Sequence, residues 1–104
     1  MIDVNTCVLG GAMIQVSVVG EIDMGTAPRL DDALMAAVGQ EAAMGVQVDF
    51  SGVTFCDSTG IASLERAYAA ATQRSAPFRL VNVQPAVARV LAIVGILQAL
   101  TDSE

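Results

Sequence analysis

Two largely apolar runs make up most of the first twenty residues. Within residues 12–19 every second position is apolar, which is typical of a strand with one solvated face. An apolar run at residues 4–9 precedes this segment. Gly10 and Gly11 separate the two runs, and such a dipeptide favours a two-residue hairpin turn. We therefore expect the chain to open with an antiparallel hairpin.

After residue 26 the apolar positions recur every third or fourth residue instead of every second residue. Thr26 supplies a capping hydroxyl and Pro28 lies in the first turn of an expected helix. Gly39 is placed to end that helix. Its apolar positions recur with helical spacing at Leu30, Leu34, Ala37 and Val38.

The remaining chain repeats a strand-and-helix pattern. Residues 46–50 and 78–83 are expected to be strands, and residues 96–100 a short edge strand. One helix begins after residue 57 and reaches about residue 74, and another runs from residue 85 to residue 95. The apolar stripes expected to face inward from these two helices are Ile61, Leu64, Tyr68 and Ala71 in the first and Val87, Val90, Leu91 and Val94 in the second.

This order of elements predicts an α/β protein. A leading hairpin followed by strand-helix-strand units gives a mixed sheet with helices packed mainly on one face. With 104 residues and no linker or repeat, residues 1–104 are expected to form a single domain. Apolar residues make up 54 % of the chain, which is enough for a packed core.

The charge of the chain restricts its partners. The net charge is −6, with five Arg and no Lys, so we expect no direct contact with nucleic acid or membrane surfaces. No charged segment precedes the apolar N-terminus, which argues against a signal peptide. The uncharged stretch at residues 4–20 is interrupted by polar residues and is a poor membrane span. A cytoplasmic location is the simplest expectation.

The chain has no histidine, which excludes Ser-His-Asp and Cys-His catalysis and most zinc or copper sites. We therefore expect no metal, no cofactor and no enzymatic activity. Cys7 and Cys56 lie far apart and form no paired motif. In a reducing compartment both are expected to be small buried hydrophobic residues.

The segment TFCDSTGIASL, residues 54–64, places several short polar residues where a strand meets a helix. One explanation is a helix cap, since Asp57, Ser58 and Thr59 are all favourable capping residues. A cap does not explain Gly60, which costs about 1 kcal/mol relative to Ala inside a helix. We expect this glycine to leave the surface of the first turn open to another molecule.

Two further explanations concern the hydroxyl groups. A catalytic nucleophile is disfavoured, because CDSTG lacks the first glycine of a nucleophile elbow and no His or Lys is available as a base. A modified hydroxyl is the other possibility. A phosphate at a helix N-terminus would meet free backbone amides and the positive end of the helix dipole.

Three segments resemble the STAS domain of bacterial anti-sigma factor antagonists. The segment VQVDFSGVTFCDSTGIASL is similar to the family's signature. GEIDMGTAPRLDDAL, at residues 20–34, resembles the family's first loop and helix, and RLVNVQPAVARVLAIVGI, at residues 79–96, its last strand and helix. Together these segments cover most of the chain in the family's order.

The resemblance implies a partner switch. Unmodified antagonists bind an anti-sigma factor that is also a serine kinase, which releases the sigma factor. The kinase phosphorylates the hydroxyl residue that corresponds to Ser58, or less favourably Thr59, and a serine phosphatase reverses this. Whether Asp49 is a structural neighbour or a contact is open. The partner interface implied for this chain consists of Asp23, Thr26, Asp57, Ser58, Thr59, Gly60 and Ile61.

Two alternatives to this function remain. The first is a STAS adaptor that is not phosphorylated, as a subunit of a transport or stress-signalling complex. The second is a small thiol-dependent or nucleotide-handling enzyme, which would require Cys56 to be exposed with a lowered pKa. No glycine-rich phosphate loop is evident. The sequence does not determine the oligomeric state, the sigma factor or the stimulus.

Overall fold

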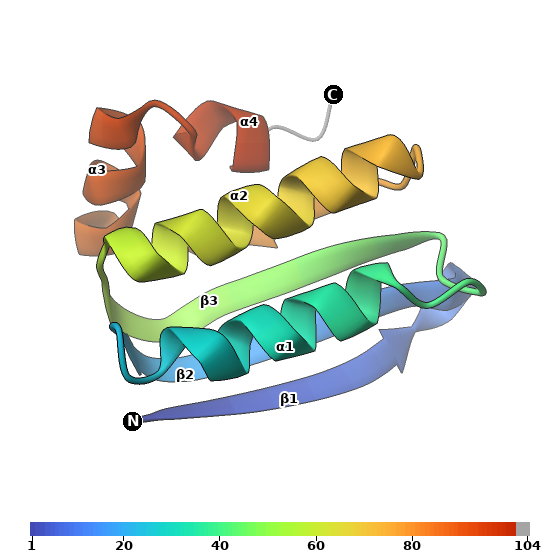
Figure 1. Cartoon of the computed structure of the whole chain (residues 1–104), viewed down its shortest axis with the longest axis horizontal. Coiled ribbons are helices and arrows are strands. Elements are labelled where there is room, and N and C mark those ends of the chain that lie inside the picture. The colour runs from blue at the N-terminus through green and yellow to red at the C-terminus, as the bar shows by residue number, and fades with distance from the viewer. Residues whose placement is uncertain (102–104) are drawn as a thin grey trace.

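The computed structural model describes residues 1–101 and shows one mixed sheet with helices beside it (Figure 1). The strands are β1 (Ile2–Leu9), β2 (Met13–Ile22), β3 (Gly45–Cys56) and β4 (Phe78–Val81). The helices are α1 (Ala27–Val38), α2 (Ser58–Gln73), α3 (Pro85–Val94) and α4 (Leu97–Thr101), and a short 3₁₀ turn, η1 (Gly10–Ala12), joins β1 to β2.

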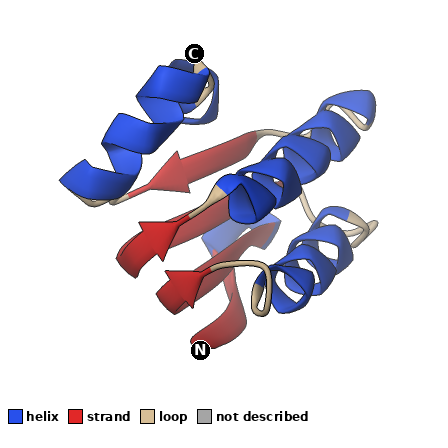
Figure 2. Ribbon diagram, turned by 60° about the vertical axis from the view of Figure 1, so that its left-hand side comes forward, coloured by secondary structure: helices blue, strands red, loops and turns tan. Residues whose placement is uncertain are grey.

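The strands lie in the order β1-β2-β3-β4. β1 pairs antiparallel with β2, whereas β2 with β3 and β3 with β4 are parallel pairs. Helices α1 and α2 lie side by side over one face of the sheet, while α3 contacts β3 and α4 contacts β4 (Figures 1 and 2). The expected α/β class, with a mixed sheet and helices mainly on one face, is confirmed.

Alternation along the strands places one set of side chains in the core. Val16 and Val18 of β2 and Val48 and Phe50 of β3 are almost completely buried, while the residues between them are more accessible. Leu64 of α2 packs into the same core with no exposed surface. Because the other face of the sheet carries mainly polar side chains, only the helix-covered face needs an apolar layer.

The turn between β1 and β2 differs from the expected two-residue hairpin. Leu9 pairs with Met13, so the connection contains three residues and forms a 3₁₀ turn. Gly11 and Ala12 both have positive φ, at 74° and 63°. Gly11 adopts this conformation without steric cost, but Ala12 does not, and the sequence pattern did not indicate that a third residue would be recruited.

The central strand β3 is longer than expected and contains two irregularities. It runs to Cys56 rather than ending at Phe50, and its register against β2 shifts twice. The first shift follows Asp49, whose Oδ1 accepts a hydrogen bond of 2.8 Å from the amide of Ser51. This bond satisfies a backbone donor next to the bulge, so Asp49 stabilises the irregular strand.

The C-terminal part of the chain corrects two predictions. Residues 96–100 were expected to be an edge strand, but Leu97–Thr101 is a helix. Val90 and Val94 were expected to face inward from α3, yet they are 37 % and 50 % exposed, and only Val87 and Leu91 are buried. The predicted stop is confirmed, since Gly95 ends α3 with φ at 95°.

Smaller differences concern single residues. The strand expected at 78–83 stops at Val81, because Asn82 has a positive φ of 58°. Tyr68 lies at the margin of the core and packs edge-on against Phe78.

The two cysteines differ from each other in exposure. Cys7 is exposed on the uncovered sheet face, so only Cys56 is buried as expected. Within residues 1–101, none of the helices is long and apolar enough to cross a bilayer.

The two phenylalanines of β3 test how much burial in the core contributes to stability. Phe50→Ala is expected to lower the free energy of unfolding by about 3–5 kcal/mol, because its side chain has no exposed surface. Phe55, on the same strand, is 51 % exposed, and Phe55→Ala is expected to cost about 1 kcal/mol. Urea unfolding of both variants measures this difference, and equal losses would contradict the assignment of Phe50 to the core.

Candidate functional site

Two loops meet at the carboxyl edge of the parallel strands β2 and β3. Ile22 and Cys56 are paired at the ends of these strands, and the amide of Asp57 donates to the Ile22 carbonyl over 3.0 Å. The loop that begins at Asp23 therefore lies beside the junction that begins at Asp57 (Figure 1). In sheets of this class, the carboxyl ends of the strands are the usual place for binding.

Asp57 is the N-cap of α2, as one of the expected interpretations requires. Its Oδ1 accepts a hydrogen bond of 2.9 Å from the amide of Thr59 and a second from the Thr59 hydroxyl. The hydroxyl contact is the main reason that the pKa of Asp57 is below its usual value, and bonds from the Thr59 and Gly60 amides add to it. The cap is therefore a carboxylate over the whole physiological range of pH.

Ser58 and Thr59 differ in what their hydroxyls do. Ser58 is exposed as the first residue of α2, and no hydrogen bond joins its hydroxyl to any of residues 1–101. The Thr59 hydroxyl donates to Asp57 and its side chain is partly buried. Of the two candidate acceptors, Ser58 thus presents its oxygen to solvent while Thr59 uses its own in the cap.

Gly60 and Ile61 do not form the open surface expected of them. Gly60 is buried, and a Cβ at this position would lie 2.5 Å from Cγ2 of Ile22 and 2.6 Å from Sγ of Cys56. Ile61 is only 5 % exposed and belongs to the core. The glycine therefore allows the first turn of α2 to pack closely against β2 and β3, and both Gly60 and Ile61 are buried in the fold.

Asp23 and Thr26 bind each other within the first loop. Oδ1 of Asp23 accepts from the amides of Gly25 and Thr26 at 2.9 and 3.1 Å. The Thr26 hydroxyl donates to the Glu21 carbonyl and accepts from the Asp23 amide, both at 2.9 Å. Thr26 precedes α1 but makes no side-chain cap to it, so the expected capping bond is absent. Both side chains remain partly accessible.

Asp49 lies apart from these loops. It pairs with Ser17 and Val81 in the middle of the sheet, seven positions before the last residue of β3. Burial acts to raise its pKa, but hydrogen bonds from Ser51 and Asn82 outweigh this effect and hold the pKa below its usual value. Of the two possibilities left open for Asp49, its place in the middle of the sheet favours a structural neighbour over a contact.

Cys56 lies beneath the site rather than in it. Its side chain is buried below Gly60, and burial together with the neighbouring charge of Asp57 raises its pKa to about 11. A thiol-dependent enzyme would need an exposed Cys56 with a lowered pKa, so this condition is not met. Within residues 1–101, no group of three Cys, Asp or Glu side chains could hold a metal ion.

The structure adds a groove that sequence analysis did not identify. It has a volume of about 450 Å³ and runs between α1 and α2 from the two loops. Met24, which is 76 % exposed, lies at its end, and Thr59 and Ala62 form part of its lining. Met24 could have been identified from the sequence, because it is a large apolar residue inside a loop of turn-forming residues. The groove itself depends on how two helices pack and left no sequence signal.

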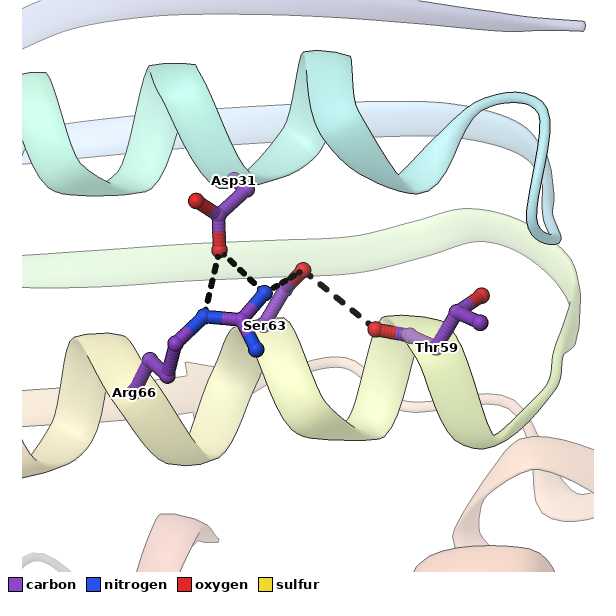
Figure 3. Close-up of polar contacts among 4 residues, drawn as sticks. All are labelled: Asp31, Thr59, Ser63 and Arg66. Carbon is purple, nitrogen blue, oxygen red and sulfur yellow. Dashed lines mark hydrogen bonds and ion pairs between the residues drawn. The ribbon is translucent and has the colours of Figure 1, made fainter.

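An ion pair connects the two helices across this groove (Figure 3). Nη2 and Nε of Arg66 donate to Oδ1 of Asp31 at 2.7 and 3.1 Å, and Nη2 also lies 3.3 Å from the hydroxyl of Ser63. Ser63 in turn donates to the Thr59 carbonyl. Because Arg66 is well exposed, the pair contributes at most about 1 kcal/mol, but it fixes the position of a cation near the site.

Comparison with known proteins agrees with this architecture. The protein family described as "Mlab, STAS domain" matches residues 8–101, and the chain therefore belongs to the STAS domain family. An anti-sigma factor antagonist from Mycobacterium paratuberculosis is 30 % identical, with a TM-score of 0.84 over 98 % of this chain and 84 % of the other. A search of curated proteins returns no match.

More distant structures share the fold. The Bacillus cell fate determinant SpoIIAA, in its phosphorylated form, is 17 % identical, with a TM-score of 0.75 over 95 % of this chain and 88 % of the other. A sulfate transporter family protein from Wolinella succinogenes is 22 % identical, with a TM-score of 0.76 over 92 % and 77 %. The same fold thus occurs among antagonists and in a transporter family.

Gly60 provides a test of the packing below the site. Gly60→Ala is expected to destabilise the protein by about 1–3 kcal/mol, because the new methyl group would overlap Ile22 and Cys56. This loss exceeds the gain of about 1 kcal/mol in helix propensity. Thermal unfolding measures the change, with the exposed Ser58→Ala as the control. A stabilised Gly60→Ala variant would show that the first turn of α2 is open.

The cap predicts a dependence of stability on pH. Since the pKa of Asp57 is lower in the folded state, its contribution is complete above the unfolded value of about 3.9 and disappears as the pH falls through the folded pKa. Asp57→Asn retains a capping side chain but not the charge, so its stability should fall less steeply below about pH 5. Denaturant titrations between pH 7 and pH 2 measure both slopes, and identical slopes would contradict this assignment.

Proposed function

We propose that the chain is an anti-sigma factor antagonist that binds an anti-sigma factor with serine kinase activity and is released when Ser58 is phosphorylated. The observation that carries the proposal is the exposed Ser58 hydroxyl at the start of α2, next to a threonine whose hydroxyl is already hydrogen-bonded. A kinase can reach the first oxygen without disturbing the cap. A serine phosphatase would return the chain to its binding form.

The surface around Ser58 suits a partner of opposite charge. The carboxylates of Asp23 and Asp57 lie on the two adjacent loops, and the whole chain has a net charge of −6. Met24 offers an apolar side chain next to a groove that could receive a partner's side chain. The proposed interface is therefore Asp23, Met24, Asp57 and Ser58, with Thr26 and Thr59 supporting its shape.

Phosphorylation would act on this surface through charge and size. A phosphate adds about −1.5 to −2 charges, and it would meet the amides at the start of α2, so the fold can accommodate it. A partner packed over Ser58 would clash with the phosphate, and its positive groups, which match the unmodified carboxylates, would no longer be in the right places. Allowing for solvent and salt, this loss corresponds to about ten- to several-hundred-fold in affinity.

Variants of Ser58 test the switch. Ser58→Asp is expected to weaken binding to a cognate anti-sigma factor by about tenfold or more, while Ser58→Ala binds like the unmodified protein. Calorimetry measures both affinities. Incubation with the kinase and ATP, followed by mass spectrometry, should locate the phosphate on Ser58 and show none in Ser58→Ala. Equal affinities for all three proteins, or a phosphate on Thr59, would contradict the proposal.

A second candidate function is favoured by the family description, which names an Mlab STAS domain. Under this alternative the chain is an adaptor subunit of a transport or stress-signalling complex and binds without phosphorylation. Both Ser58 variants would then keep their affinity for the partner. A kinase-type anti-sigma factor encoded beside the gene supports the first function, and a transport ATPase encoded there supports the second.

A further inference from the structure

Strand β1 is an unprotected edge of the sheet. It pairs only with β2 among the elements of residues 1–101, so its other side has no strand partner there. Its central segment, residues 4–8, reads VNTCV and contains neither a charged residue nor a proline. Proteins usually place charges or prolines on such edges to prevent pairing with another chain. The central part of this edge lacks both, which suggests that pairing is its function.

The hydrogen-bonding pattern shows which residues face the open side. Ile2 pairs with Gly20, so the same register places Met1 opposite Glu21. The Glu21 amide donates to the Met1 carbonyl over 3.2 Å, which makes Met1 and Glu21 a hydrogen-bonded pair. In an antiparallel ladder this makes Ile2 a residue whose own polar groups point away from β2, and every second residue behaves alike. The contact of Arg29 with the Ile2 carbonyl on the outer side agrees with this assignment.

The same alternation leaves three residues free at the edge. Val4, Thr6 and Val8 direct their amides and carbonyls outward, and no other group of residues 1–101 is recorded as bonding to them. Ile2 does not belong to this set, because the guanidinium of Arg29 already covers its carbonyl. Gly10 is also excluded, since it lies in the 3₁₀ turn. The free edge is therefore short and has defined limits.

An apolar groove continues from this edge. It has a volume of about 410 Å³ and lies between β1 and the C-terminal half of α1, with Thr6 and Val8 on one side. Ala33, Ala36 and Ala37 line the α1 side, so small side chains leave the space open. Val8 is 74 % exposed as a result. A strand added to β1 would cover Val8 and extend the layer over this groove.

We propose that β1 pairs antiparallel with β1 of a second copy of this chain, with the two-fold axis at Thr6. The segment is nearly palindromic around that residue. Antiparallel pairing places Val4 opposite Val8 of the second copy, Asn5 opposite Cys7, and Thr6 opposite Thr6. Pairs of β-branched residues and Thr–Thr pairs are favourable cross-strand neighbours, and no like charges meet. An isologous contact requires this kind of self-complementarity, which an unrelated partner would not explain.

The free edge groups select this register over its neighbours. With the axis at Thr6, the three free residues Val4, Thr6 and Val8 bond only to one another. A register centred on Asn5 would need Ile2, which is covered by Arg29. A register centred on Cys7 would need Gly10, which has left the strand. Pairing at Thr6 alone uses all the available groups and no others.

The resulting dimer has one continuous sheet of eight strands. Its joining edge is separate from the candidate site, since Val8 pairs with Ile14 near the start of β2 whereas Asp57 contacts Ile22 at the other end. The dimer therefore carries two Ser58 sites that remain accessible. The inference does not depend on the proposed function, and Ser58→Asp is expected to leave the assembly unchanged.

Sedimentation equilibrium tests the dimer. The unmodified chain should approach twice its monomer mass of 10.7 kDa as its concentration increases. Thr6→Lys should weaken association by about tenfold or more, because two ammonium groups would meet at the axis. Thr54→Lys is the matched control, since Thr54 is exposed on β3, away from the joining edge, and the substitution should leave the mass unchanged. A monomeric mass for the unmodified chain at all concentrations would overturn the proposal.

A cross-linking experiment tests the register. In the proposed dimer, Asn5→Cys places its thiol opposite Cys7 of the second copy in a non-hydrogen-bonded pair, where side chains are closest. Mild oxidation should then give a covalent dimer whose peptide map shows residue 5 joined to residue 7. Asp3→Cys is two positions out of register and should not cross-link. A bond between two residues 5, or between two residues 7, would overturn the position of the axis.

Discussion

The parallel pairing of β2 with β3, continued to the bond between Asp57 and Ile22, positions every part of the candidate site. It holds the ends of two strands together, so the two loops that follow them are neighbours although they are more than thirty residues apart in sequence. Helices α1 and α2 start from these loops and lie side by side. Without this pairing, neither the carboxylates nor the groove would form a common surface.

Close packing under the first turn of α2 completes the arrangement. Gly60 lets the helix approach Ile22 and Cys56 to a distance that no side chain could tolerate. Close packing at Gly60, two residues further along α2, holds Ser58 at the surface, and Asp57 caps the start of the helix. The polar residues and the glycine of this motif therefore have different tasks. The polar residues cap the helix and expose a hydroxyl, and the glycine allows the helix to pack closely against the sheet.

The sequence predicted those features that depend on local patterns. The alternation in β2, the capping residues before α2 and the left-handed glycine after α3 all have short-range causes. The segment expected to be a strand at residues 96–100 forms a helix from Leu97, because a short segment with four apolar residues carries no distinctive period and tertiary packing against β4 decides its conformation. The buried position of Gly60 could not be inferred either, since it depends on Ile22, which is 38 positions away.

The two cysteines have opposite exposures to the solvent. Cys7 is on the open face of an edge strand, whereas Cys56 is enclosed under the helix that carries Ser58 and its pKa is raised to about 11. An oxidant such as peroxide reacts with accessible thiolates, so it would modify the edge of the sheet long before it reached the interior. Oxidation of cysteine is therefore confined to the edge of the sheet, and the packing beneath Ser58 is unaffected by it.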